Sequence, residues 1–535
     1  MWKAAAFVLL FGVAIWGGAA GDGRGTPNRG GQADSSGFRG NLLVVPVDGS
    51  HWVGIKALAQ EMGRRGHRVT VVMPEVTIRV GPGEHYGTVT YPVPYDRDKV
   101  RSVLALQADF MRKSSWSLTE RMTKRWTQIR SIGNLIHSNA ESLLFNSSLM
   151  SHLAQQGFHA VLTDPLEPTG NFIARRFGIP TINLLRALPC SLDVKSAGCP
   201  SPPSYVPRYF TGYLDRMSFT ERTVNTLVAL LEPLLCRLIY WHFDVMAHRF
   251  FGEKVSTAEV LSESDVWLLR TDTIFETPRP VMPNMIHIGG INCNIRNPLP
   301  EGLESWLGGG HGFVVFTLGS LVSQMPEEKT SVFLEAFRQI PQKVIWRYAG
   351  QVPNHVPDNV KMMDWVPQND LLAHPGARAF ITHAGSHGLF EGLCHAVPMV
   401  MVPLGAEQPD NAQKLVKKGV GVMLDIHTLT TESLLRGLSD VINDSRYKEK
   451  VQELSALHKD RPVDPLDLAV FWTEFVMRHN GTKHLRPAAR QLNWFQYFCL
   501  DVAALLVTVL LLLGMLMVKG LKLCLRKPAA KKKRE

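Results

Sequence analysis

The stretch that most constrains this chain runs from Ala379 to Asn411 and reads AFITHAGSHGLFEGLCHAVPMVMVPLGAEQPDN. The apolar run Ala379–Thr382 predicts a buried parallel strand. A helix should begin at Ser386, since apolar residues then recur every fourth position, and Pro398 should end it (Leu389, Leu393 and Val397). A second apolar run, Met399–Val402, leads into a polar turn. The stretch therefore predicts a strand, a glycine turn, a helix and a second strand.

This unit is the one with which doubly wound sheets bind nucleotides, because the free N–H groups and the dipole of the first helical turn favour a diphosphate. Glu391 lies one turn into the helix and could accept hydrogen bonds from a ribose diol. Glu407 and Gln408, in the polar turn, could do the same for sugar hydroxyls. An ordinary βαβ unit with a tight glycine turn accounts for the periodicity equally well.

The residue order favours the nucleotide site. THAGSHG, EGLCHAVPMVMVPL, and then an acid, Gln408 and Asp410-Asn411 resemble the signature of the UDP-glycosyltransferases, in detail that of the UDP-glucuronosyltransferase branch. The resemblance extends from His51 to the C-terminal tail. It implies an α/β fold of the GT-B type, in which two Rossmann-like domains face each other across a cleft, with one C-terminal transmembrane helix. It also implies UDP-glucuronate as donor substrate and no cofactor.

The remaining apolar runs fit two such domains. Leu42–Val47 and His67–Met73 read as strands, and Ile55, Leu58, Ala59 and Met62 give the buried face of the helix between them. The linker residues near Gly289-Gly290 place a domain boundary near Ile291. The resemblance implies that residues 21–290 bind the acceptor. Residues 291–490 are expected to form the UDP-sugar-binding domain together with a return segment. Strands and a helix of the second domain are expected at Phe313–Leu318, Glu327–Gln339 (the helix), Val344–Tyr348, Val360–Trp365, Phe380–Thr382 and Met399–Val402.

Two residues are candidates for the chemistry. His51 and Asp164 each follow a predicted strand, where open α/β sheets place their ligands. A lone histidine at a helix start commonly meets only water, and Asp before Pro commonly makes a turn. The resemblance implies that His51 is the general base and that Asp164 orients it, a pair that can deprotonate an acceptor hydroxyl near neutral pH.

The resemblance also assigns the donor site. Trp365 should stack on the uracil, Gln368 should hydrogen-bond the nucleoside, and Glu391 should bind the ribose. The diphosphate should be held by Ser320, His383, Gly385, Ser386, His387 and Gly388. No metal is expected, because His383 and His387 are explained by the diphosphate turn and His374 offers no third ligand.

Two positions bear on the sugar. Arg270 is the candidate partner of the donor carboxylate, where a guanidinium fork would suit it, although an arginine near the linker could equally be structural. Glu407 stands where the familiar glucuronosyl enzymes have Asp, which shifts the carboxylate by one methylene. The alternative donor is therefore UDP-glucose or another hexose.

The two ends of the chain are predicted to be targeting and membrane-anchoring segments. Residues 1–20 fit a cleaved signal peptide, and residues 494–518 an aromatic belt followed by an apolar membrane span. Residues 519–535 carry eight Lys or Arg against Glu535, which predicts a cytosolic tail and a lumenal bulk. The terminal Lys532-Lys533-Arg534-Glu535 matches the family's dilysine pattern for the endoplasmic reticulum membrane.

Charge and cysteines set further limits. The net charge is +11, but the tail holds +7 of it, so no basic field argues for nucleic acid. Seven cysteines form no zinc pattern, and Cys190 with Cys199 is the expected disulfide. Three sequons, at Asn146, Asn443 and Asn480, would be lumenal.

The acceptor region is the least regular part of the chain. Residues 76–139 and 187–243 are rich in Met, Phe, Trp and Tyr, and the resemblance implies that they shape a pocket for a small lipophilic acceptor. Val224–Tyr240 is an apolar helix that could lie on the bilayer, while core packing is expected for its individual leucines.

The leading hypothesis is an inverting glucuronosyltransferase. The rival hypothesis, from another functional class, is a non-catalytic, membrane-anchored sugar-binding protein. The base at His51 argues against it. The identity of the acceptor is not given by the sequence. The resemblance implies a homo- or hetero-oligomer with related enzymes, and the residues themselves do not show one.

Overall fold

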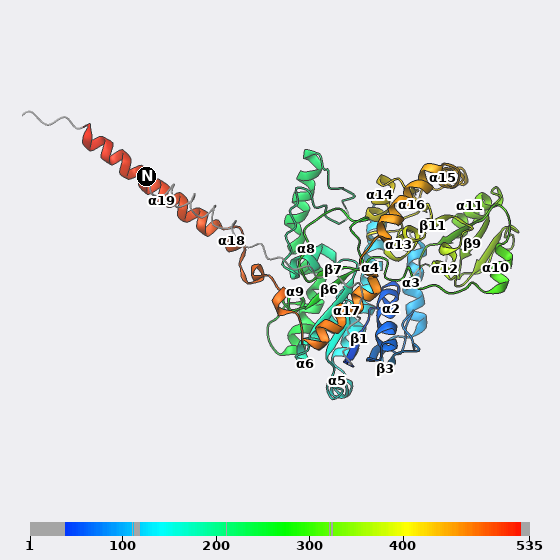
Figure 1. The fold of residues 1–535 in the computed structure, drawn as a ribbon, viewed down its shortest axis with the longest axis horizontal. Helices are drawn as coiled ribbons and strands as arrows, with labels where there is room; N and C mark the ends of the chain where they lie inside the picture. The colour runs from blue at the N-terminus through cyan, green and yellow to red at the C-terminus, as the bar shows by residue number, and fades with distance from the viewer. Residues whose placement is uncertain are drawn as a thin grey trace, which may run out of the picture. The chain divides into compact units, whose positions relative to one another are not determined.

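The computed structural model describes residues 38–109, 111, 118–209, 211–319, 322 and 325–525 (Figure 1). Its core consists of two parallel sheets, each flanked by helices. The predicted signal peptide, residues 1–20, and residues 526–535 of the predicted tail lie outside the described residues. Short apolar runs give parallel strands because helices cover both faces of such sheets. This is the two-domain α/β architecture of the GT-B type that the sequence predicts.

The first sheet has seven strands in the order β3-β2-β1-β4-β5-β6-β7. They are β1 (Asn41–Val45), β2 (Arg68–Pro74), β3 (Gly87–Tyr91), β4 (Ala160–Thr163), β5 (Thr181–Leu185), β6 (Val266–Leu269) and β7 (Met285–His287). Helix α2 (Ser50–Arg64) buries the four apolar residues that predicted it, Ile55, Leu58, Ala59 and Met62. The other helices of this part are α3 (Arg97–Asp109), α4 (Leu118–Leu144), α5 (Ser147–Ala154), α6 (Thr169–Phe177), α7 (Leu192–Ser196), α8 (Phe219–Phe251) and α9 (Thr257–Ser262).

The second sheet has six strands in the order β10-β9-β8-β11-β12-β13. They are β8 (Phe313–Thr317), β9 (Lys343–Arg347), β10 (Val360–Met363), β11 (Ala377–Thr382), β12 (Met399–Met401) and β13 (Gly421–Met423). The predicted strands of this domain are all present, but β10 ends before Trp365. Its helices are α10 (Glu301–Leu307), α11 (Glu327–Arg338), α12 (Gln368–Ala373), α13 (Ser386–Cys394), α14 (Gln408–Lys417), α15 (Thr431–Asn443) and α16 (Ser445–Lys459). The boundary near Ile291 falls between β7 and β8 and stays a prediction.

After the second sheet the chain returns to the first. Helix α17 (Pro465–Arg478) lies beside α2 (Figure 1), and its Glu474 contacts His67 at 3.1 Å. Beyond α17, the backbone N–H of Thr482 donates to Asp265 Oδ1 at 2.8 Å. The C-terminal segment is therefore part of the packing of the amino-terminal domain.

Helix α8 corrects one expectation. It is longer than the predicted Val224–Tyr240 helix, and the leucines expected in the core are 45–72% exposed (Leu227, Leu230, Leu231, Leu234, Leu235 and Leu238). Burial instead falls on Tyr240, Phe243 and Met246, near its carboxyl end. An apolar sequence does not indicate which side of a helix has a partner to pack against.

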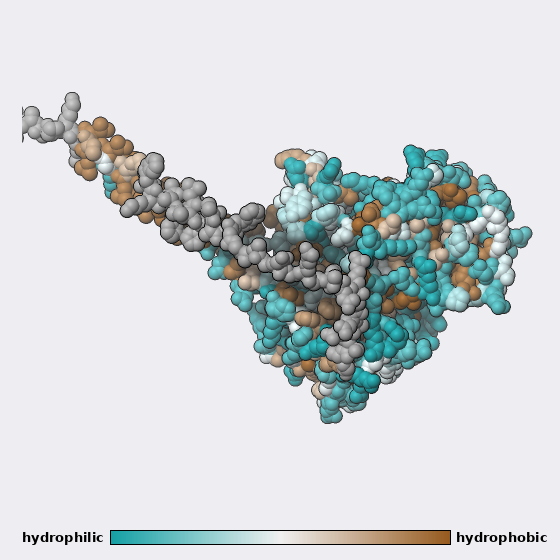
Figure 2. All heavy atoms as spheres, viewed as in Figure 1, coloured by the Kyte–Doolittle hydropathy of each residue, from teal (hydrophilic) through white to brown (hydrophobic). Residues whose placement is uncertain are grey.

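The C-terminal apolar segment forms two helices. The aromatic belt gives the short helix α18 (Trp494–Tyr497), and the span is α19 (Leu500–Cys524), which extends past the predicted end at 518. Helix α19 is exposed along its length and predominantly hydrophobic (Figure 2), as a membrane-spanning helix would be. Helix α8 is the other described helix long and apolar enough to cross a membrane.

The disulfides differ from the expected pairing. Cys190 is bonded to Cys236, on α8, and a second disulfide joins Cys293 to Cys394. Cys199 is free and buried. The predicted Cys190–Cys199 pair was wrong because nearness in sequence was the only guide, whereas the actual partner lies 46 residues away on a helix that the fold brings alongside.

Candidate functional site

One large cavity lies at the carboxyl ends of strands from both sheets. It encloses about 3090 Å³ of empty space, part of it open to solvent. Twelve of the predicted site residues line it: His51, Arg270, Trp365, Gln368, His383, Gly385, Ser386, His387, Gly388, Glu391, Glu407 and Gln408. Asp164 lies behind the wall, and Ser320 is outside the described residues. The fold thus gathers candidates from both domains around one space, the predicted cleft.

His51 and Asp164 form a pair at this cavity. His51 is in the first turn of α2, after β1, and Asp164 directly follows the neighbouring strand β4. His51 Nδ1 donates to Asp164 Oδ2 at 2.6 Å, with the histidine side chain 28% exposed and the aspartate 1%. The other carboxylate oxygen accepts from the backbone N–H of Leu166 at 3.0 Å. The imidazole is therefore held in one orientation with its Nε2 edge available to a ligand.

Electrostatics keep this aspartate ionised. Burial alone would raise the pKa of Asp164, but the charges of His51 and Arg270 and the two hydrogen bonds outweigh it and lower the pKa. A buried carboxylate that stays charged can stabilise an imidazolium beside it.

The turn expected to hold the diphosphate precedes helix α13, which begins at Ser386 as the sequence predicts. Gly385 is the N-cap of α13, so the backbone N–H groups of its first turn have no intrahelical partner. A Cβ on Gly388 would come within 3.3 Å of Phe380 and of Thr382 Oγ1, so the helix packs closely on its strand. Ala384, with φ +63°, is in the left-handed region, which is strained for a residue with a side chain. The helix N-terminus is thereby fixed at the cavity.

The two histidines of this turn are electrically neutral. Burial lowers the pKa of His383 to about 4, and Arg347 adds to the effect. The pKa of His387 is lowered well below its ordinary value, first by burial and then by Arg270, whose guanidinium contacts its Nε2. His383 Nδ1 is buried and has no hydrogen-bond partner among the residues that the structure describes. Neutral imidazoles suit hydrogen bonding to a ligand.

The predicted ribose and base residues lie together. Gln368, at the start of α12, donates its side-chain amide to Glu391 of α13. Burial raises the pKa of Glu391 to about 7. Trp365 is 49% exposed, and the guanidinium carbon of Arg79 lies 3.7 Å from its ring centroid. A stacked base would share this aromatic surface with the arginine.

The turn expected to bind the sugar follows β12. Gln408 Oε1 accepts from the backbone N–H groups of Leu404 and Gly405, at 2.7 and 3.1 Å, which engages its oxygen within the turn. Ala406 has φ +51°, a second strained position at the cavity. Glu407 is half-buried, and its charge acts on both Arg186 and Arg270.

Arg186 is a cavity residue that the sequence reasoning missed. It is buried and pairs with Glu276 at 2.5 Å, and Glu276 pairs with Lys414 of α14 at 2.7 Å. Arg186 also donates to Asn411 Oδ1 at 3.2 Å, and Asn411 donates to the carbonyl of Ala384 at 3.0 Å. The signal was available, because Arg186 follows the apolar run of β5 just as Asp164 follows that of β4.

Residues 40–535 match the family described as UDP-glucoronosyl and UDP-glucosyl transferase. The chain belongs to this family. Human UDP-glucuronosyltransferase 1A1 is 44% identical over 501 residues, covering 92% of this chain and 94% of the relative. Human UDP-glucuronosyltransferase 1A6 is 42% identical over 530 residues, covering 98% and 96%. Among solved structures, spinosyn forosaminyltransferase SpnP has a TM-score of 0.57 at 17% identity, covering 82% of this chain and 100% of its own. That likeness shows the fold alone.

In this UDP-glycosyltransferase the part that the structure describes contains one group of three possible metal ligands, Cys293, Cys394 and His458. The two sulfur atoms are joined as a disulfide and so offer no thiolates to an ion. His374, weighed earlier as a ligand, instead contacts Glu304 at 3.0 Å.

Proposed function

We propose that this enzyme transfers glucuronate from UDP-glucuronate to a hydroxyl of a small lipophilic acceptor, with inversion to a β-glucuronide. The observation that carries the proposal is the His51–Asp164 pair at the same cavity as the residues expected to bind UDP. The identity to relatives named UDP-glucuronosyltransferases supports the donor. The apolar lining residues Leu166, Leu188 and Pro189 support a lipophilic acceptor.

The geometry suits general base catalysis. In the neutral tautomer whose Nδ1–H donates to Asp164, His51 has its lone pair on Nε2, which can take the acceptor's hydroxyl proton. The oxygen then attacks the anomeric carbon as the bond to UDP breaks. The backbone N–H groups at the start of α13 and the neutral His387 would stabilise the negative charge on UDP.

The cellular setting belongs to the same proposal. Helix α19 would anchor the enzyme in the endoplasmic reticulum membrane, with the catalytic domains in the lumen and the basic tail in the cytosol. The enzyme would form homo- or hetero-oligomers with related enzymes. The apolar, exposed α19 and the Lys and Arg residues after it support the anchor and its orientation.

The test is UDP release from UDP-glucuronate and from UDP-glucose, offered separately with a panel of simple phenols as acceptors, beside His51→Ala. Release with glucuronate that disappears in the variant is expected. Release with glucose only would refute the donor and favour the hexosyl alternative, for which Glu407 is the supporting residue. UDP binding without release from either donor would favour a non-catalytic sugar-binding protein.

A further inference from the structure

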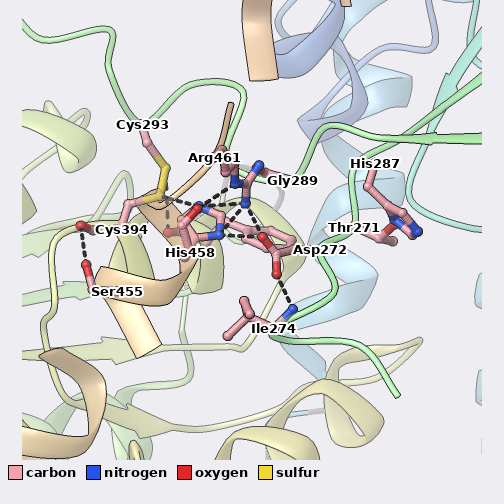
Figure 3. Close-up of polar contacts among 11 residues, drawn as sticks. Thr271, Asp272, Ile274, His287, Gly289, Cys293, Cys394, Ser455, His458 and Arg461 are labelled. Carbon is pink, nitrogen blue, oxygen red and sulfur yellow. Dashed lines mark hydrogen bonds and ion pairs between the residues drawn. A yellow bond between two sulfur atoms is a disulfide. The ribbon is translucent and has the colours of Figure 1, made fainter. Parts of the chain in front are cut away.

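A disulfide connects the interdomain linker to the helix expected to bind the donor. Cys293 follows the Gly289-Gly290 pair, and Cys394 is the last residue of α13 (Figure 3). Glu391, expected to bind the ribose, lies one helical turn before Cys394. The bond therefore fixes the carboxyl end of α13 to the linker between the two sheets.

A buried acid–base group lies against this disulfide. His458 Nε2 is 3.1 Å from Cys394 Sγ, and Nδ1 is 2.6 Å from Asp272 Oδ2 (Figure 3). Arg461 contacts the same carboxylate and donates to the carbonyl of Gly289 at 2.9 Å. His458 and Asp272 are each 4% exposed. Asp272 follows β6 two residues after Arg270, so the group joins both domains at the donor side.

The other sulfur faces the donor side. Cys293 lines a small cavity together with Arg270, Ser386, His387 and Glu391. These are residues expected to contact UDP-glucuronate. Cys293 is 6% exposed and Cys394 is fully buried, so a reductant would reach the disulfide from the Cys293 side, where a bound nucleotide would cover the approach.

We propose that Cys293–Cys394 is a redox-active site whose reduction by a dithiol weakens donor binding. A thiolate of the dithiol attacks Cys293 Sγ and the bond to Cys394 breaks. The Cys394 thiolate takes a proton from Nε2 of His458 in its imidazolium form, which Asp272 stabilises. The second thiol of the reagent then closes on the mixed disulfide and releases Cys293 as a thiol. One dithiol becomes one cyclic disulfide, its two protons ending on the two cysteines and the histidine being restored.

Reduction weakens donor binding because it frees the carboxyl end of α13 to move. With the bond broken, α13 is no longer tied to the linker at its carboxyl end, and Glu391 loses its fixed place relative to Arg270. This step rests on the proposed function only in naming the donor, because loss of UDP affinity can be measured without any transfer. We expect the reduced protein to bind UDP about tenfold more weakly.

The experiment treats the full-length protein in detergent with dithiothreitol, alkylates free thiols at successive times and reads each cysteine by mass spectrometry. Cys190–Cys236 in the same molecule is the reference disulfide. Saturating UDP should slow reduction of Cys293–Cys394 at least about tenfold and leave the reference unchanged. His458→Gln should slow it by a similar factor, whereas His395→Gln, which removes a histidine bonded to Asn369, should not.

UDP affinity by calorimetry completes the test. The double variant Cys293→Ser, Cys394→Ser should match the reduced protein, and both should bind UDP about tenfold more weakly than the oxidised protein. Equal reduction rates with and without UDP, or unchanged UDP affinity after reduction, would overturn the proposal. If His458→Gln also alters the reference disulfide, the variant is misfolded and UDP protection of the natural chain decides. Failure of glucuronate transfer with these results intact would refute the proposed function alone.

Discussion

Asp164→Asn should remove most of the activity by changing which nitrogen of His51 carries the proton. Asp164 Oδ1 accepts from the backbone N–H of Leu166, and Oδ2 accepts from His51 Nδ1. In the variant the amide oxygen stays with Leu166, so the NH₂ group faces Nδ1. Nδ1 must then accept, Nε2 carries the proton, and the histidine cannot remove one from the acceptor.

The magnitude follows from two losses. A hydrogen bond to a charged group contributes about 1.5–3 kcal/mol, which is about a 10- to 150-fold effect on rate if it is fully used in the transition state. Loss of general base catalysis adds to this, and such catalysis contributes about 10²- to 10⁴-fold by itself. We therefore expect kcat to fall at least about 10²-fold, with little change in UDP affinity, because Asp164 does not line the cavity.

The assay is steady-state UDP release with UDP-glucuronate and a phenol, with UDP affinity measured alongside. The kcat of His51→Gln, which removes the base itself, should fall by at least as much. If Asp164→Asn keeps kcat within about threefold of the natural enzyme, the pairing has no part in catalysis and the mechanism given above is wrong.

Four further changes probe the rest of the site. Burial raises the pKa of Glu391 from 4.5 to about 7, so the folded state holds this proton more tightly than the unfolded state. The free energy of unfolding without UDP should therefore fall by about 3 kcal/mol as pH rises from 4.5 to 7. Glu391→Gln should abolish this fall in calorimetric scans, and an unchanged pH profile would contradict the assignment. Trp365→Ala should raise the Kd for UDP about tenfold by calorimetry, unless the base does not stack there. Glu407→Asp should shift the ratio of kcat/KM values toward UDP-glucuronate over UDP-glucose by about tenfold, and an unaltered ratio would clear Glu407 of a role in sugar choice. Arg186→Met, which removes one partner of Glu276, whose side chain is only 15% exposed, should cost about 3–5 kcal/mol in urea unfolding. A loss below about 1 kcal/mol would show that Lys414 alone suffices.

The local elements could be predicted because burial repeats along the chain with the period of each element. The apolar runs gave the strands, and Ile55, Leu58, Ala59 and Met62 gave the buried face of α2. His51 and Asp164 were placed at strand ends by the apolar runs before them, where open α/β sheets place their ligands, whereas the donor-site residues were predicted from the resemblance to the family. The strand predicted to reach Trp365 ends at Met363, since a single apolar run does not mark where hydrogen bonding between strands stops.

Long-range pairing was decided by the tertiary structure. His51 and Asp164 are 113 residues apart and meet because β1 pairs with β4, an order that no local pattern encodes. The same holds for the Arg186–Glu276–Lys414 pairs, for both disulfides and for the His458–Asp272–Arg461 group. The exposed leucines of α8 were the opposite case, since their sequence fits a core and only the absence of packing partners among the described residues leaves them exposed. The sequence by itself determined the family, the strands and the donor motif, because these depend on neighbours in the chain. Which charges, sulfurs and apolar faces find partners depends on the order of the strands, and only the folded chain decided that.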